Sequence, residues 1–394
     1  MHKTSNADVL KPGWKVWRFD QIATNVNARI DNPSESGMEH YVGLEHLDAD
    51  SLKIRRWGSP SDVEAAKLCF IVGDIIFGKR RAYQRKLGIA EFDGICSAHA
   101  MVLRVKPEAV IPEFLPFFMQ SDLFMNRAIE ISVGSLSPTI NWKTLAVQEF
   151  TLPSLDDQKK SVRELLSIEN LLSSQVNALS SARTVRLALV EDGLSSNFDL
   201  ARVRPLGDFL TDLSYGSSSR SAYEDKGYPI LRIPNVLRGR IDYSDLQHLE
   251  LNEKEYGRLA LDEGDVLIVR TNGNPEYVGR SVVVPVLSEP MVYASYLIRI
   301  RSDHARLRPA FLAEYLNAPS TRQRMRGEVK SSAGNYNINI AGIRKQPICL
   351  PNADAQDELL TSLSVLDSAI EELESRFETC KLFKKQLLNK IWES

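Results

Sequence analysis

The densest group of side chains that could do chemistry is a basic loop at residues 79–86. It packs five cations, an aromatic ring and a glutamine into eight residues, and no acid interrupts it. Guanidinium and ammonium groups hold phosphates, and Arg and Gln also reach base edges. The alternative interpretation is a charge run that only meets solvent. The residues predicted to contact DNA in this loop are Lys79, Arg80, Arg81, Tyr83, Gln84, Arg85 and Lys86.

Two further polar loops are also predicted to contact DNA, although they carry fewer charged residues. Residues 270–280 are rich in side chains that hydrogen-bond to base edges. The members predicted to contact DNA are Arg270, Thr271, Asn272, Asn274, Tyr277 and Arg280. A third loop, at 134–139 in one half and 331–337 in the other, is predicted to contribute Ser135, Thr139, Asn335, Tyr336 and Asn337. For this third loop, a simple turn without DNA contact stays open.

Two segments are similar to enzymatic motifs, but each lacks a residue that its motif requires. Residues 73–80 have the spacing of a phosphate-binding P-loop, but Arg80 stands where Ser or Thr should hold Mg²⁺, and residues 74–77 predict a strand. Residues 274–277 are similar to the Asn-Pro-Pro-Tyr motif of adenine methyltransferases. The third position is Glu276, and no glycine-rich cofactor loop lies upstream, so a turn is the favoured interpretation.

Metal and thiol chemistry are not indicated either. The six histidines show no HExxH or other ligand spacing, and the four cysteines are singletons without a CxxC. We therefore predict no catalytic constellation, no metal site and no cofactor bound by this chain.

The chain is internally duplicated, and this sets its architecture. Ile140-Asn141 and Leu152-Pro153 return as Ile338-Asn339 and Leu350-Pro351, 198 residues later. Upstream, the Gly-Asp pair at 73–74 matches that at 264–265. A period this long indicates duplicated domains rather than a solenoid. Because the blocks repeat while the loops between them differ, the halves share a scaffold and differ in what they present.

Each half mixes strand-like runs with one main helix, near 112–131 in the first half and 309–328 in the second. This pattern predicts an α/β class, with α+β as the other possibility. The predicted domains are residues 1–153 and 200–351, each followed by a spacer helix, at 154–199 and 352–394.

Apolar residues recur every three to four positions along both predicted helices. Ser154 and Asn352 are placed to cap their N-termini, and Gly193 to cap the C-terminus of the first. A narrow seam of this length predicts an intramolecular antiparallel coiled coil separating the two domains. The alternative is that each helix packs only on its own domain. The predicted seam comprises Leu165, Ile168, Leu172, Leu179, Leu363, Leu366, Ile370 and Phe377.

Composition agrees with a protein of two domains. The 394 residues, 43% of them hydrophobic, suffice for two cores, and the formal net charge is −2. A DNA-binding chain needs a basic face rather than a basic total. Neither a signal peptide nor an apolar run of bilayer length is evident, so a cytoplasmic location without membrane contact is expected.

Two variable halves, each closed by Leu-Pro and a long helix, resemble the specificity subunits of type I restriction-modification enzymes. The markers are the repeated Gly-Asp pairs, the Ile-Asn, Leu-Pro and Gln blocks, and the ending Lys384-x-x-Leu387-Leu388. The resemblance implies target-recognition domains that each read one part of a split double-stranded DNA site. It also implies docking of modification subunits, two by expectation, and of restriction subunits. S-adenosylmethionine and ATP with Mg²⁺ would reside on those partners.

Two other classes stay open from the sequence: a DNA-modifying enzyme with a degenerate active site, and a protein-interaction scaffold that does not bind DNA. The target site itself cannot be deduced, because loop geometry and DNA shape decide which bases are read.

Overall fold

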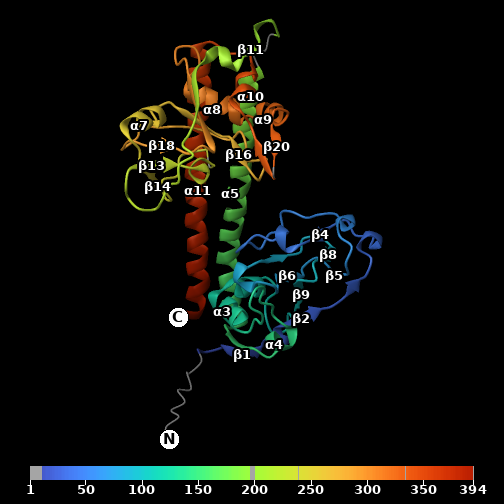
Figure 1. Ribbon diagram of the computed structural model, residues 1–394. Helices are drawn as coiled ribbons and strands as arrows, with labels where there is room; N and C mark the ends of the chain where they lie inside the picture. The colour runs from blue at the N-terminus through green and yellow to red at the C-terminus, as the bar shows by residue number, and fades with distance from the viewer. Residues whose placement is uncertain (1–10, 196–199, 238, 333, 394) are drawn as a thin grey trace. The chain divides into compact units, whose positions relative to one another are not determined.

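The structure, a computed structural model, describes residues 11–195, 200–237, 239–332 and 334–393. Backbone contacts divide the chain into two units (Figure 1). The first comprises the described residues up to Ala178 and from Leu373, and the second comprises Leu179–Glu372. Each unit therefore has one globular part and a portion of both long helices. The domain boundaries expected from the sequence stay predictions.

The first unit is built on two four-stranded sheets and four short helices (Figure 1). One sheet is fully antiparallel, in the order β2 (Ala23–Val26), β9 (Ala100–Val105), β6 (Ile75–Gly78) and β7 (Leu87–Ile89). The other has the order β3 (Arg29–Ile30), β5 (Lys67–Phe70), β8 (Gly94–Cys96) and β4 (Tyr41–Val42). The helices are α1 (Phe19–Ile22), α2 (Phe114–Gln120), α3 (Asp122–Glu130) and α4 (Trp142–Ala146), and β1 (Lys15–Arg18) pairs with β10 (Glu149–Leu152).

Strand β6 is buried on both faces because it lies between two cores. Ile75 and Phe77 join the cluster that contains Phe114 and Phe118 of α2. Ile76, which points the other way, joins the cluster beneath the second sheet. This double burial explains why β6 reads as an uninterrupted apolar run.

The second unit repeats the central sheet. Its order is β12 (Leu210–Tyr215), β19 (Leu297–Ser302), β15 (Val266–Val269) and β17 (Ser281–Val283). A two-stranded sheet pairs β11 (Arg204–Pro205) with β22 (Pro347–Ile348). One three-stranded sheet has the order β14 (Gln247–Leu249), β13 (Tyr228–Leu231) and β18 (Val292–Tyr293). Another has the order β16 (Thr271–Asn272), β21 (Asn335–Asn337) and β20 (Lys330–Ser332). The helices are α6 (Ile233–Val236), α7 (Glu253–Leu259), α8 (Pro309–Asn317), α9 (Pro319–Arg326) and α10 (Ile340–Arg344). Mixed sheets and helices confirm the expected class, in its α+β form.

The repeated Gly-Asp pairs have one structural task in both units. Asp74 accepts hydrogen bonds from the Ile71 amide at 3.0 Å and from the Arg104 guanidinium at 2.7 and 2.8 Å. Asp265 repeats this with the Asp262 amide and Arg301. The carboxylate thus closes the turn that leads into the central strand and ties it to the neighbouring strand.

Both expected main helices are interrupted once. In the first unit, Ser121 adopts an extended conformation between α2 and α3, and its hydroxyl accepts from the Phe124 amide. In the second unit, Ala318 separates α8 from α9, which has Pro319 in its first turn. The expectation of single helices over 112–131 and 309–328 was therefore wrong. A capping serine and a helix-starting proline restart the chain in a new direction.

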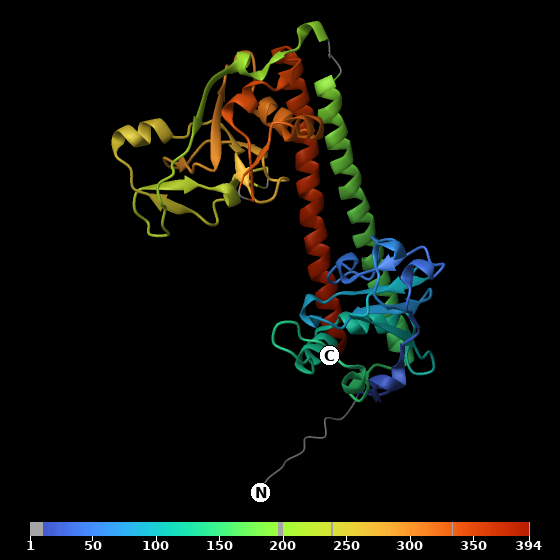
Figure 2. The ribbon, with the colours of Figure 1, turned by 45° about the vertical axis from the view of Figure 1, so that its right-hand side comes forward.

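The two long helices are α5 (Leu155–Ser195) and α11 (Ala353–Glu393), each of 41 residues. The predicted caps are confirmed, because Ser154 accepts from the Asp157 amide at 3.2 Å and Asn352 from the Ala355 amide at 2.9 Å. In the second unit, Arg186 of α5 binds Asp367 of α11, and the two helices run antiparallel (Figure 2). Glu169 and Lys384 make the equivalent antiparallel contact in the first unit.

Gly193 does not end α5; it lies within the helix, so its predicted capping role was wrong. The reason for a glycine there is close packing in the second unit. A Cβ atom at this position would lie 2.7 Å from the Leu359 side chain of α11. The predicted seam residues are half-buried or buried: Leu165, Leu172, Leu179, Leu363 and Ile370 are buried, and Ile168, Leu366 and Phe377 are half-buried.

Candidate nucleic-acid interface

In the first unit the basic loop begins where β6 ends. Arg81 and Arg85 both have left-handed backbones, with φ of 57° and 53°, and they flank a short helical turn at Ala82–Gln84. Left-handed geometry is unusual for residues with a Cβ and persists only where surrounding contacts enforce it. The loop is therefore shaped by specific contacts rather than by local preference.

The structure brings the basic loop together with the predicted loop that precedes Ile140. The Ile140 amide donates to the Lys79 carbonyl at 3.0 Å, and the Arg81 amide to the Pro138 carbonyl at 2.7 Å. Arg80 and Thr139 form an antiparallel bridge. Two predicted contact loops, separated by some fifty residues of sequence, thus form one surface.

Ser137 fixes the orientation of the two arginines and was missed as a site residue. Its hydroxyl accepts from Arg80 Nη2 and from Arg81 Nε, each at 3.2 Å. It stands between the two predicted residues Ser135 and Thr139, so its place in the loop was its only sequence signal. Ser135 is exposed and Thr139 half-buried.

The cations of the basic loop divide into two groups. Arg85 forms ion pairs with Asp50 at 2.6 Å and Asp122 at 2.9 Å, and Lys86 donates to the Leu44 carbonyl at 2.7 Å. These two are engaged inside the unit. The second group consists of Arg80, which is half-buried, and Arg81, which is exposed. Beside these two arginines, Tyr83 is 53% exposed and Gln84 is half-buried. This second group is the one available to a ligand.

Lys79 and His99 both have a pKa below the ordinary value of their residue type. Burial, followed by the nearby positive charge of Arg29, lowers the pKa of the half-buried Lys79. Burial also lowers the pKa of His99, and the charges of Arg80 and Lys79 lower it further. His99 therefore titrates below its usual range, which leaves the arginines as the permanent charges of this surface.

The second unit joins its two predicted loops in the same way. The Ile338 amide donates to the Arg270 carbonyl at 2.9 Å, as Ile140 does to Lys79. Thr271 pairs with Asn337 and Asn272 with Tyr336, which adds β16 to the β20–β21 hairpin. Asn335 lies exposed at that hairpin.

Contacts with an aromatic ring and hydrogen bonds within turns fix the side chains of Arg270, Asn272 and Asn274. The Arg270 guanidinium lies over the Tyr215 ring at 4.6 Å and donates to the Ser295 carbonyl. Tyr215 was not predicted as a site residue, since it comes from β12, far away in sequence. Asn272 and Asn274 use their side-chain oxygens to accept turn amides at 2.8 and 3.0 Å.

Arg280 and Tyr277 lie at the edge of this surface. The Arg280 guanidinium is 4.7 Å from the Tyr277 ring centre and donates to the carbonyls of Glu276 and Leu237. The Glu276 carboxylate also pairs with Arg326 at 2.5 Å. An acid therefore balances one arginine at this edge of the surface, whereas Arg280 donates to backbone carbonyls.

The described parts of the chain offer neither a metal site nor a membrane-spanning helix. In residues 11–195, 200–237, 239–332 and 334–393, no three His, Cys, Asp or Glu side chains are grouped so as to hold a metal ion. No helix in those parts is long and apolar enough to cross a membrane.

Comparison with known proteins gives these surfaces a context. A family model described as the type I restriction modification DNA specificity domain matches residues 39–179. The EcoKI type I specificity subunit of Escherichia coli K12 is 27% identical over 71% of this chain, and the StySPI specificity subunit of Salmonella potsdam is 22% identical over 75%. Residues 39–179 therefore belong to the type I DNA specificity domain family, and the chain as a whole is similar to type I specificity subunits. The matches span 64% and 66% of those two relatives, slightly under two thirds of their lengths.

Solved structures of the family have the same fold. A chain from a study of assembly and conformational transition of the type I restriction-modification system aligns with a TM-score of 0.59 and 19% identity, over 97% of this chain and 98% of that one. The type I specificity subunit of M. genitalium aligns with a TM-score of 0.54 and 12% identity, over 96% of both chains. At these identities the likeness concerns the fold alone.

Proposed function

We propose that the chain is the DNA-specificity subunit of a type I restriction-modification complex and has no catalytic activity of its own. Each unit would read one part of a bipartite double-stranded site. The observation that carries the proposal is that both units join their two predicted contact loops through the same backbone hydrogen bond, from Ile140 to Lys79 and from Ile338 to Arg270. One scaffold thus presents two different polar surfaces.

By family membership, the partners in this proposal are modification subunits, two in number, and restriction subunits. S-adenosylmethionine and ATP with Mg²⁺ would be bound by those partners. The purified chain should then transfer no methyl groups alone and should direct site-specific methylation when its modification subunit is added. Methylation by the chain alone, with S-adenosylmethionine binding seen by calorimetry, would favour the alternative of a degenerate DNA-modifying enzyme.

DNA binding can be tested at Arg80 and Arg81. Mapping methylated adenines in the host genome first identifies the target duplex. Changing both arginines to Ala should weaken binding to it, and each lost phosphate contact should lower the log–log salt slope by about 0.9. If one of them reads a guanine, discrimination at that base pair should fall by roughly 1–3 kcal/mol.

The matched control is Arg127→Ala, which removes a 47%-exposed arginine of α3 in the same unit. Its affinity and salt slope should equal those of the wild type. Unchanged binding in the double variant would assign residues 79–86 to solvated surface. No binding by the wild-type chain, alone or with its partner, would leave the scaffold alternative.

Modularity is a second test. Replacing residues 1–153 by the equivalent half of a related subunit should change one part of the recognised site and leave the other part intact. The reason is that the scaffold blocks repeat while the loops differ. A swap that alters both parts together would contradict independent reading.

A further inference from the structure

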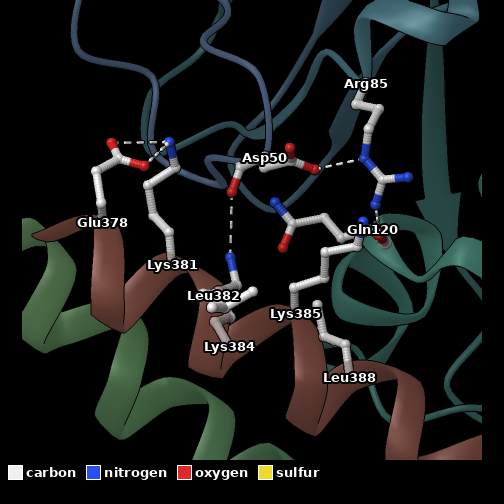
Figure 3. A pocket seen from close by; sticks show the side chains of 9 residues that line it. All are labelled: Asp50, Arg85, Gln120, Glu378, Lys381, Leu382, Lys384, Lys385 and Leu388. Atoms are coloured by element: carbon white, nitrogen blue, oxygen red, sulfur yellow. Dashed lines mark hydrogen bonds and ion pairs between the residues drawn. The ribbon is translucent and has the colours of Figure 1, made fainter.

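A pocket of about 220 Å³ in the first unit has no part in the proposed DNA surface. It opens between α2, nearby loops and the last turns of α11 (Figure 3). Its walls combine two acids, four cations, two leucines and one carboxamide. The lining residues are Asp50, Arg85, Gln120, Glu378, Lys381, Leu382, Lys384, Lys385 and Leu388.

The carboxamide of Gln120 is the unusual group in this pocket. Gln120 is the last residue of α2 and is 1% exposed, yet neither its amide nitrogen nor its amide oxygen has a hydrogen-bond partner among the described residues. Figure 3 shows its side chain reaching between Asp50 and Lys385. Leaving a buried polar group unpaired costs about 1–3 kcal/mol. A ligand that offers one donor and one acceptor side by side would remove that cost.

The second unit shows what a carboxamide at this position binds. Asn317 is the last residue of α8, the counterpart of α2. Its side-chain oxygen accepts from the Ser281 amide at 3.0 Å, and its nitrogen donates to the Ser281 carbonyl at 2.9 Å. The side chain therefore grips one residue of an extended strand through its main chain. Gln120, longer by one methylene, occupies the repeated position beside β7, the strand that corresponds to β17, but among the described residues its carboxamide makes no such hydrogen bonds.

The charges at the pocket mouth indicate what else a ligand carries. Lys381 and Lys385 are one turn apart on α11, and their side chains are 42% and 58% exposed. Lys385 lies 3.6 Å from Asp122, and Lys381 lies 3.2 Å from Glu378 on its own helix. Two like charges at this spacing repel each other, and a carboxylate between them would relieve the repulsion.

We propose that this pocket binds an extended acidic peptide segment of a partner protein. One peptide group of the segment pairs with the Gln120 carboxamide, and its carboxylate lies between Lys381 and Lys385. Leu388, which is buried, and Leu382, which is 58% exposed, provide the apolar wall. The site shares Arg85 with the basic loop, but Arg85 is engaged by Asp50 and Asp122, and neither Arg80 nor Arg81 lines the pocket. Each proposal can therefore fail without the other.

The probe is N-acetyl-aspartate N-methylamide, which carries two peptide groups and one carboxylate. The full-length chain is labelled with ¹⁵N-glutamine, and the Gln120 side-chain signals are assigned by their loss in Gln120→Met. Adding the probe at millimolar concentration should shift these signals saturably. The corresponding lysine probe should cause no saturable shift, and Lys381→Gln with Lys385→Gln should weaken binding of the aspartate probe at least fivefold.

The matched control is Lys160→Gln, which removes an exposed lysine of α5 in the same unit and should leave the titration unchanged. A shift without saturation, or equal shifts with the aspartate and lysine probes, would overturn the proposal. The first result would mean that water or a neighbouring side chain satisfies Gln120, and the second that the two lysines do not select an acidic ligand.

Discussion

In each unit an ion pair at a repeated position joins α5 to α11, but the two ion pairs differ in their residues and in the number of carboxylates. In the first unit Lys384 binds Glu169 at 2.7 Å. In the second unit Arg186 binds Asp367 at 2.5 Å and Glu314 at 2.7 Å. Lys384 and Glu169 stand at the duplicated positions of Arg186 and Asp367. The sign of each charge is repeated, whereas the number of carboxylates is not.

The difference follows from the geometry of the two cations. A guanidinium fork can serve two carboxylates at once, whereas an ammonium acts as a compact point charge. Hydrogen bonds from Arg186 to Asp367 and then Glu314 raise the pKa of Arg186. Burial lowers the pKa of Lys384, although Glu169 partly opposes this shift. Lys384 also donates to the Asp50 carbonyl, which ties α11 to the globular part of the first unit.

The largest expected effect is at Arg186. Arg186→Met would leave two carboxylates close together without their cation. The free energy of unfolding should fall by roughly 2–4 kcal/mol, less than for a fully buried pair because the Asp367 side chain is 46% exposed. Chemical denaturation followed by circular dichroism measures it. Arg186→Lys, which keeps one charge, should lose less. A loss below 1 kcal/mol in Arg186→Met would show that this pair contributes little.

A smaller loss, roughly 2–3 kcal/mol, is expected for Lys384→Met. Only one carboxylate is left, and Glu169 keeps a hydrogen bond from the Leu52 amide. If Lys384→Met destabilises the chain more than Arg186→Met does, the number of carboxylates does not decide the cost.

The Lys384→Met variant also tests a pH dependence of stability, which is not expected for Arg186. Because the pKa of Lys384 is lowered on folding, the folded chain binds fewer protons than the unfolded chain between the lowered pKa and the ordinary value near 10.5. Stability contributed by this group should therefore rise with pH across that alkaline window. Subtracting the profile of Lys384→Met from that of the wild type isolates this rise, and a flat difference would contradict the shift.

The smallest effects concern the two carboxamides. Asn317→Leu leaves the Ser281 amide and carbonyl without this partner and should cost about 1–3 kcal/mol. Gln120→Met removes an amide that has no hydrogen-bond partner in the described part of the chain, so the free energy of unfolding should be unchanged or higher. Thermal unfolding of the two variants compares them directly, and an equal loss would show that Gln120 is paired inside the unit.

Sequence patterns that depend on near neighbours were predictive. Strand β6, the caps Ser154 and Asn352 and the long helices all follow from short-range spacing, because each depends on residues within a few turns or one strand. The duplication itself placed the recurrent Asp74 and Asp265. Gly193 was misjudged because glycine signals both helix ends and close helix packing, and only the position of Leu359 distinguishes them.

Only the tertiary structure decided which polar groups are free. Arg85 and Arg81 belong to one loop and have the same side chain, yet Arg85 is engaged by Asp50 and Asp122 while Arg81 is exposed. Within the residues that the structure describes, both side-chain amide atoms of Gln120 lack a hydrogen-bond partner, whereas both of Asn317 have one. A residue's type fixes which hydrogen bonds it can make, but partners far away in sequence determine which of them it makes. For that reason the sequence determined the scaffold and the family of this protein, and the packing of distant segments decided its available surfaces.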